Sequence, residues 1–169
     1  TDASVFTAEL SVNTTGNDLV YDRILFDEGN DYNPVTGEYV CPQSGTYVFI
    51  TSCHVASSDE FFYLMKNGQR DKYPVYAYNP HDDTQDSGTS SGVSITQCAE
   101  TNVISMEGFY SSTEHVAQLS SWAGFQLNSD IAFMAKLRDY KYYTNEVTIV
   151  YDEVLTNVGG WYIPAAGWF

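Results

Sequence analysis

Closely spaced acidic side chains are the residues of this chain whose types and spacing could bind an ion. Asp82, Asp83 and Asp86 follow His81 in the polar loop of residues 79–92. Calcium prefers hard oxygen ligands, and carboxylates on an adaptable segment can supply them. The spacing differs from that of an EF-hand loop, and a solvated acidic loop is the alternative interpretation. The loop is therefore a candidate calcium site, and the sequence suggests no other cofactor.

The overall charge narrows the choice of partners. The chain carries 22 acidic residues against 7 lysines and arginines, a formal net charge of −15, and a second acidic turn contains Asp27, Glu28 and Asp31. A divalent cation bound to the folded state would relieve this repulsion, so we expect calcium to act on stability and assembly. The same charge repels phosphate groups, which argues against nucleic acid and anionic membranes as partners. The sequence contains no run of about 18 apolar residues, so it does not predict a segment that spans a membrane.

The sequence lacks the motifs of the common enzyme classes. Three histidines, His54, His81 and His115, limit the catalytic arrangements. The chain has no Gly-x-Ser-x-Gly elbow, no His-Glu-x-x-His zinc motif and no glycine-rich phosphate loop before a helix. His54 lies at the end of a predicted strand and is interpreted as a structural histidine. The sequence predicts a protein that is not an enzyme.

Strands and tight turns must position these groups. Pro34 and Gly37 supply a preset φ and a residue free to take positive φ, as chain reversal requires. Residues 46–54 then present aromatic or apolar side chains on both faces, which is typical of a strand packed on two sides. Asn67-Gly68 predicts a hairpin between two apolar runs. Because no window shows a sustained helical stripe, the sequence predicts an all-β protein.

The stretch of residues 32–49 resembles the signature of the complement C1q globular-head family, which belongs to the tumour-necrosis-factor-like jelly rolls. The residues that fill this signature in register are Tyr32, Asn33, Thr36, Gly37, Tyr39, Pro42, Gly45, Tyr47 and Phe49. A match of this length in one window is specific. The resemblance implies an all-β jelly-roll sandwich.

Further similarity to the family extends the match along the chain. Phe6 and Ala8 resemble its opening strand, and residues 120–127 resemble its closing strand. Residues 100–102 depart from the pattern, because the family usually has Gly-Asp there. The resemblance covers residues 5–127 and implies a first domain over residues 1–130.

The resemblance also implies a function. C1q-like heads typically form compact trimers that bind glycans, microbial surfaces or proteins through loops, so we expect a secreted, extracellular recognition module. The alternative is an acidic structural or matrix protein that assembles through its C1q-like domains, with calcium as a candidate ion. A cytokine of the tumour-necrosis-factor type fits the superfamily but not the signature. A start without methionine is typical of a mature secreted product, for which Asn13 in Asn-Thr-Thr would be a glycosylation acceptor.

Aromatic residues of the core and closing strands are candidates for the trimer interface. A sandwich strand that is apolar on both faces needs a cover on both. We therefore expect a homotrimer or a higher assembly with contacts at Tyr47, Phe49, Trp122 and Phe125. The pattern does not show which of these aromatics faces the trimer axis and which faces the core.

Three cysteines, Cys41, Cys53 and Cys98, are too few for a disulfide scaffold and lack a Cys-x-x-Cys spacing. They allow one disulfide and one thiol, or three buried thiols. In the jelly roll that the chain resembles, the strand ending at Cys53 lies beside the strand that follows Cys98. The resemblance therefore favours a Cys53–Cys98 disulfide, with Cys41 free or paired between chains.

Residues 131–169 look like the beginning of a second copy of the same domain. Residues 132–137 echo residues 5–10, and residues 150–155 echo residues 20–25. Four further residues repeat at a constant offset of 130: Tyr162, Pro164, Gly167 and Phe169 correspond to Tyr32, Pro34, Gly37 and Tyr39. So short a segment rarely folds alone. We expect either a companion fragment that completes the second sandwich or attachment to the sheet edge of a neighbouring subunit.

Overall fold

A computed structural model describes residues 4–56, 60–77, 88–109, 114–127, 132–136, 151, 153–160 and 163. The chain divides into two compact units, Thr1–Leu127 and Asn128–Phe169. The described residues contain strands and turns but no helix, which confirms the predicted all-β class. Accordingly, the described part of the chain has no helix of the length and hydrophobicity needed to cross a membrane.

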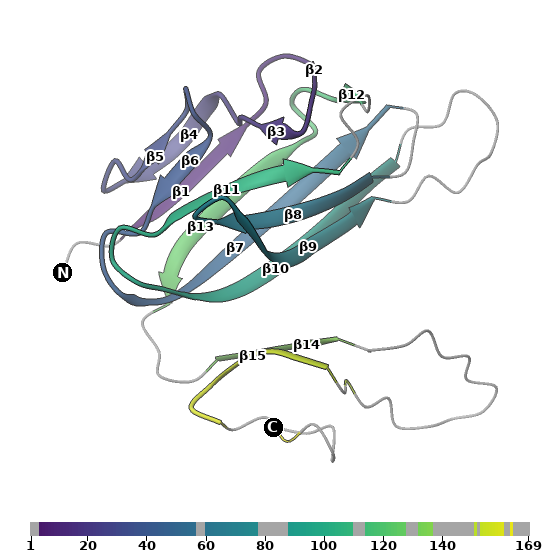
Figure 1. The fold of residues 1–169 in the computed structure, drawn as a ribbon. Helices are drawn as coiled ribbons and strands as arrows, with labels where there is room; N and C mark the ends of the chain where they lie inside the picture. The colour runs from purple at the N-terminus through teal and green to yellow at the C-terminus, as the bar shows by residue number, and fades with distance from the viewer. Residues whose placement is uncertain are drawn as a thin grey trace, which may run out of the picture. The chain divides into compact units, whose positions relative to one another are not determined.

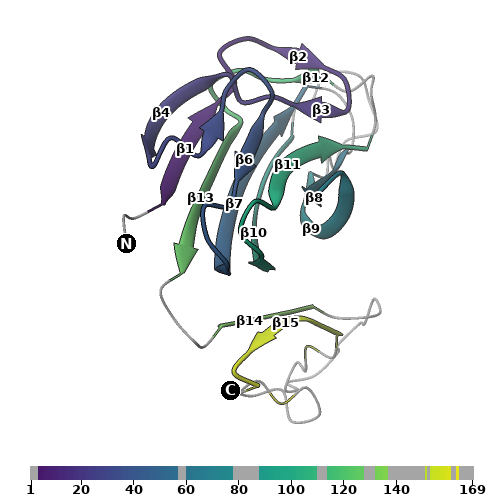
Figure 2. The same ribbon diagram turned by 60° about the vertical axis from the view of Figure 1, so that its left-hand side comes forward.

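The first unit is a sandwich of two antiparallel sheets, seen as two layers in Figures 1 and 2. The larger sheet has the order β2-β12-β7-β13-β1-β4, with β10 also paired to β7. Its strands are β1 (Val5–Glu9), β2 (Thr14–Thr15), β4 (Arg23–Glu28), β7 (Gly45–Val55), β10 (Gly88–Cys98), β12 (Glu114–His115) and β13 (Ser121–Leu127).

The smaller sheet has the order β5-β6-β11-β8-β9, with β3 paired to β11. Its strands are β3 (Asp18–Leu19), β5 (Tyr32–Asn33), β6 (Glu38–Val40), β8 (Glu60–Lys66), β9 (Gln69–Ala77) and β11 (Val103–Gly108). Asn67 and Gly68 both have positive φ, 51° and 72°, between β8 and β9. The hairpin predicted at this pair is thereby confirmed, since such a tight turn requires left-handed residues.

The core between the sheets is built from stacked aromatic rings. Phe6 stacks on Tyr32 at 4.7 Å between ring centroids and meets the edge of Trp122 at 4.8 Å. Phe49 stacks on Trp122 at 5.7 Å. Offset stacked and edge-to-face pairs of this kind add to the free energy gained from burial. The aromatic residues of the signature therefore serve mainly to pack the two sheets together.

The second unit contains one described hairpin, β14 (Ala132–Lys136) with β15 (Glu153–Val158). Its register reproduces that of β1 with β4: Phe133 faces Asn157 as Phe6 faces Asp27. The register of both pairings also shifts after the third residue of the first strand. At this shift one residue of the partner strand has no residue opposite it. A bulge at a fixed position is a specific feature of a strand pair. The two hairpins thus share geometry as well as sequence pattern.

Candidate assembly surface

The larger sheet has one face toward the core and one face toward solvent. Along β7, Tyr47 and Phe49 are buried in the core, whereas Val48 and Ile50 alternate with them and point outward. Side chains of a strand alternate between the two faces of its sheet. Ile50 is 42% exposed although it lies in the middle of the sheet. Ile50 is therefore available to a partner, whereas Val48 on the same side is only 9% exposed.

The register joins these outward side chains into a continuous apolar surface. Ile50 faces Val93 of β10 and Ala123 of β13, and Val48 faces Ile95 and Phe125 on the same strands. We call this surface the outer apolar face; its members are Val5, Phe26, Val48, Ile50, Val93, Ile95, Ala123 and Phe125. Phe26, on the edge strand β4, is 51% exposed, and Val93 is 47% exposed. A contiguous exposed apolar patch of this kind marks an interaction site.

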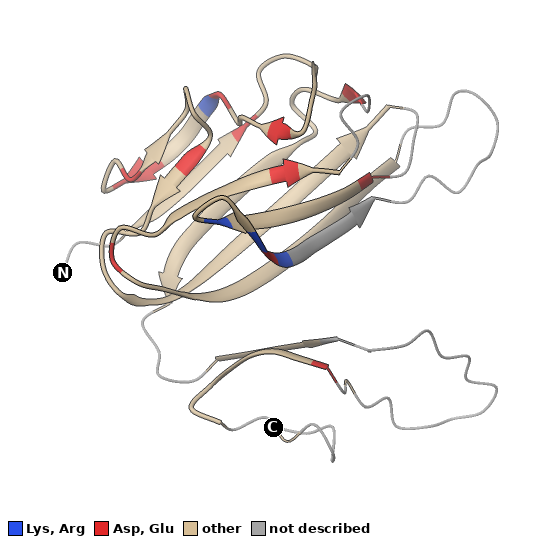
Figure 3. Ribbon diagram, in the orientation of Figure 1, with Lys and Arg blue, Asp and Glu red and all other residues tan. Residues whose placement is uncertain are grey.

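Three strands of this sheet carry no charge, whereas β1 and β4 beside them carry the Glu9–Arg23 ion pair and Glu28, which lies opposite Val5. The sequences of β7, β10 and β13 contain no Asp, Glu, Lys or Arg, although the whole chain has a net charge of −15. Figure 3 shows the described lengths of these three neighbouring strands without charged residues. Like charges on two acidic chains repel each other. The outward side of β7, β10 and β13 is therefore the part of the described sheet that copies can bring together at the smallest electrostatic cost.

The outward side of the smaller sheet has a different character. Arg70 of β9 pairs with Glu107 of β11 at 2.8 Å. The guanidinium of Arg70 also covers the ring of Tyr63, at 4.0 Å from the ring centroid. Charged groups of β9 and β11 thus lie on this side, and Figure 3 shows where the charged residues fall along these two strands. The contrast favours the larger sheet as the assembly surface.

Three of the four aromatics predicted at the trimer interface were assigned wrongly. Tyr47, Phe49 and Trp122 are at most 1% exposed and belong to the core between the sheets. Phe125 lies on the outer apolar face, opposite Val48, and its place in a trimer interface stays a prediction. Both faces of β7 are apolar, so the strand pattern alone could not show which face is turned inward. The side chains that the prediction omitted are aliphatic, chiefly Ile50 and Val93.

A buried acid and histidine pair was also missed, because Glu60 was expected in a loop. Glu60 begins β8 and is fully buried, and its Oε1 accepts hydrogen bonds from the backbone N–H groups of Phe61 at 3.0 Å and Phe109 at 2.6 Å. His115 is 1% exposed and packs against the ring of Phe62, 5.6 Å away. Burial lowers the pKa of His115, and the nearby charge of Glu60 opposes part of that effect.

The burial of His115 near Glu60 predicts that the folded protein loses stability at acidic pH. His115 has a pKa below its ordinary value of 6.5 in the folded protein, so the unfolded chain binds its proton first as the pH falls. The stabilising contribution is present above pH 6.5 and is lost as the pH falls through the folded-state pKa. We expect the melting temperature to fall from pH 7.5 to 5.5, and a His115→Gln variant to show a smaller fall. His54→Gln is the matched control, since the ring of His54 bonds to Thr89 at the surface; equal slopes for wild type and His115→Gln would contradict the assignment.

The predicted Cys53–Cys98 disulfide is wrong. Cys53 faces Ser90 and Cys98 faces Gly45 in the pairing of β10 with β7. Eight residues of β7 separate these positions, about 26 Å at roughly 3.3 Å per residue, whereas a disulfide requires Cα atoms within about 7 Å. The strand after Cys98, β11, pairs with β6 and β8 in the other sheet, not with β7. All three cysteines are buried and unbridged.

The other sequence predictions meet the structure only in part. Asp82, Asp83 and Asp86 lie outside the described residues, so the calcium site stays a prediction. Elsewhere, no group of three or more His, Cys, Asp or Glu side chains among the described residues could hold a metal ion. Asn13 is exposed; its Nδ2 donates to Glu114 Oε1 at 3.0 Å, and its Oδ1 accepts from the N–H of Ala117 at 2.9 Å. Its glycosylation also stays a prediction.

The sandwich of two antiparallel sheets is a tumour-necrosis-factor-like jelly roll, and similar solved structures have this fold. The globular domain of zebrafish complement 1qA is similar with a TM-score of 0.57 and 16% identity, over 73% of this chain and 97% of that one. Murine APRIL at pH 8.5 is similar with a TM-score of 0.51 and 11% identity, over 74% and 99%. At these identities the similarity shows the fold.

The family is shown by sequence. The model of the C1q domain matches residues 5–124, and the chain belongs to the C1q domain family. Mouse complement C1q tumor necrosis factor-related protein 7 is 24% identical over 126 residues, which are 72% of this chain and 42% of that protein. Mouse complement C1q tumor necrosis factor-related protein 2 is 30% identical over 93 residues, 55% of this chain and 30% of that protein. The chain spans less than half the length of these relatives.

Proposed function

We propose that this chain is a secreted, non-enzymatic recognition module that assembles as a homotrimer through the outer apolar face of its larger sheet. The observation that carries this proposal is the combination of exposed Ile50, Val93 and Phe26 with three strands that lack charge in a strongly acidic chain. Burying such a surface removes apolar area from water, which is the main driving force of stable association. Membership of the C1q domain family supports the trimeric state.

The proposed ligand is a glycan or a protein bound through surface loops, away from the assembly surface. A pocket of about 210 Å³ lies outside the outer apolar face, beside β3, the β5–β6 turn and β11. Its lining includes the hydrogen-bond acceptors of Asp18, Glu38 and Ser105. Carboxylate and hydroxyl oxygens can accept hydrogen bonds from hydroxyl or ammonium donors. The net charge of −15 therefore favours neutral or cationic ligands over anionic ones.

Light scattering tests the assembly. We expect the chain to have three times its own mass of 18.9 kDa at micromolar concentration, because the outer apolar face is buried between copies. A monomer at that concentration would contradict the proposal. The same measurement in EDTA and in millimolar calcium, together with a glycan array, separates a recognition module from the matrix alternative. Saturable ligand binding supports the recognition module. Calcium-dependent growth of the assembly without saturable binding supports the matrix protein.

We also infer that residues 131–169 begin a second C1q-like domain. The shared register and bulge of the two hairpins support this inference. In the first unit β1 lies between β4 and β13, whereas among the described residues β14 pairs with β15 alone. The inference therefore places a strand equivalent to β13 beside β14, supplied by a companion segment or by another subunit. Light scattering of a variant lacking residues 128–169 distinguishes the two, since loss of assemblies larger than a trimer indicates attachment to another subunit.

A further inference from the structure

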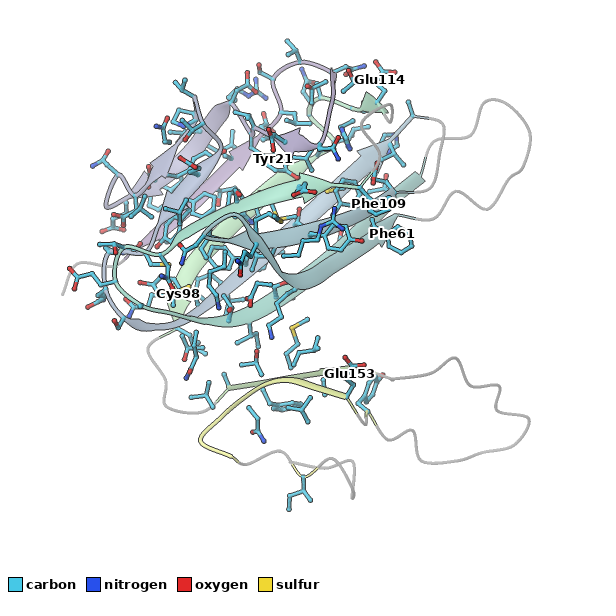
Figure 4. The ribbon with its side chains drawn as sticks, viewed as in Figure 1. Tyr21, Phe61, Cys98, Phe109, Glu114 and Glu153 are labelled. Carbon is cyan, nitrogen blue, oxygen red and sulfur yellow. The ribbon has the colours of Figure 1, made fainter. Side chains whose placement is uncertain are left out.

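Two of the buried cysteines lie together at one end of the sandwich. Cys98 ends β10, and the chain then turns back through Asn102, whose N–H donates to the carbonyl of Ala99 at 3.1 Å. This turn holds Cys41, which follows β6. The N–H of Cys41 donates to the carbonyl of Asn102 at 2.9 Å, and the carbonyl of Cys41 accepts from the N–H of Thr101 at 2.8 Å. Figure 4 marks Cys98 at this end of the first unit.

The side chains of this pair interact directly. The thiols of Cys41 and Cys98 lie close enough to share a hydrogen bond, and both belong to the same hydrophobic core cluster. The bond from Cys41, together with the charge of Lys66, lowers the pKa of Cys98. The bond to Cys98, together with burial, raises the pKa of Cys41. Cys98 is therefore the thiol of the pair that loses its proton more readily, an asymmetry that suits attack by Cys98 on a disulfide.

Cys53 has a different environment. It lies far along β7, 1% exposed, where its sulfur is 3.4 Å from the hydroxyl of Tyr21 and 3.5 Å from that of Thr51. Burial raises the pKa of this thiol to about 11. In the pairing of β7 with β10, Cys53 lies eight residues from the position opposite Cys98, so it has no cysteine beside it on that strand. The structure thus separates one interacting pair of cysteines from one cysteine that lies apart from them.

We propose that Cys41 and Cys98 form an intrachain disulfide that links the two sheets when the chain meets a small-molecule disulfide such as oxidised glutathione. The Cys98 thiolate attacks one sulfur of glutathione disulfide, forming a mixed disulfide and releasing one glutathione thiolate. Cys41 then gives up its proton, and its sulfur attacks the Cys98 sulfur and releases the second glutathione. Two protein thiols are oxidised, and one glutathione disulfide is reduced to two molecules of glutathione.

The link would join the two layers of the sandwich. Cys41 directly follows β6 of the smaller sheet, and Cys98 belongs to β10, which pairs with β7 of the larger sheet. A covalent bond between them closes the long loop from residue 41 to residue 98. Closing a long loop restricts the unfolded chain and raises stability. We expect the oxidised protein to melt at least about 5 °C above the reduced protein.

Peptide mapping after refolding of the full chain in reduced and oxidised glutathione tests this proposal. The thiols are alkylated under denaturing conditions before digestion, so that every cysteine is scored. We expect a linked pair of peptides containing Cys41 and Cys98, with Cys53 alkylated. Cys53→Ser is the matched control and should keep both the link and the difference in melting temperature. Cys41→Ser and Cys98→Ser should each lose them.

Two results would overturn the proposal. One is a fully alkylated protein after equilibration with excess oxidised glutathione, and the other is a linked peptide that contains Cys53. Wild-type protein reduced with dithiothreitol gives the melting temperature of the unlinked state without any substitution. The test therefore stands even where a serine variant fails to fold.

Discussion

An Ile50→Asp variant is expected to be monomeric at micromolar concentrations at which the wild-type chain is a trimer. Ile50 lies in the middle of the outer apolar face, between Val93 and Ala123. Assembly would bury the new carboxylate among apolar side chains without a cation, which costs several kcal/mol for each subunit. Since about 1.4 kcal/mol changes an equilibrium constant tenfold, association should weaken by at least about a hundredfold. Light scattering over a dilution series measures this loss.

Val35→Asp is the matched control for that experiment. Val35 is 83% exposed and lies between β5 and β6 of the smaller sheet, outside the outer apolar face. The control makes the same change from an apolar to an acidic side chain, and it should remain a trimer. Ile50 is 42% exposed in the single chain, so both variants should fold, which circular dichroism checks. A trimeric Ile50→Asp protein would exclude the outer apolar face as the interface.

A Gly124→Ala variant is expected to lose about 1–3 kcal/mol of unfolding free energy, as overpacked cores do. Gly124 pairs with Phe6 on β1 and with Phe49 on β7, so it lies between two phenylalanine rings on the core side of the sheet. A Cβ atom at this position would lie 2.5 Å from a ring carbon of Phe6 and 2.6 Å from one of Phe49. Both rings are fixed by further aromatic neighbours and have little room to move. Urea unfolding measures the change.

Gly45→Ala is the control for this substitution. Gly45 also lies in the larger sheet, and a Cβ there would meet the amide end of Gln126 at 2.5 Å. That end belongs to a flexible side chain and can move aside, so the expected loss is below about 1 kcal/mol. Equal losses for the two variants would show that the ring contacts do not make Gly124 special. A larger loss of unfolding free energy at Gly124 would explain why β13 has a glycine between Phe6 of β1 and Phe49 of β7.

The sequence by itself determined the features that depend on a few consecutive residues. The all-β class follows from short apolar runs between turns, and the hairpin at Asn67-Gly68 follows from residues that accept positive φ. The resemblance carried by residues 32–49 led to the same family as the match over residues 5–124. These features could be predicted because short-range sterics and alternation act within one segment of the chain.

Only the tertiary structure decided which segments lie beside one another. It turned Tyr47 and Phe49 inward and Ile50 outward, although all three fit the same apolar strand. It also placed Cys98 beside Cys41 instead of Cys53, because the strand that follows Cys98 joins the smaller sheet. The burial of Glu60 near His115 depends in the same way on neighbours distant in the sequence. The physical reason is that alternation fixes two faces for every strand, whereas the pairing of distant strands determines which face becomes the core and which thiols meet.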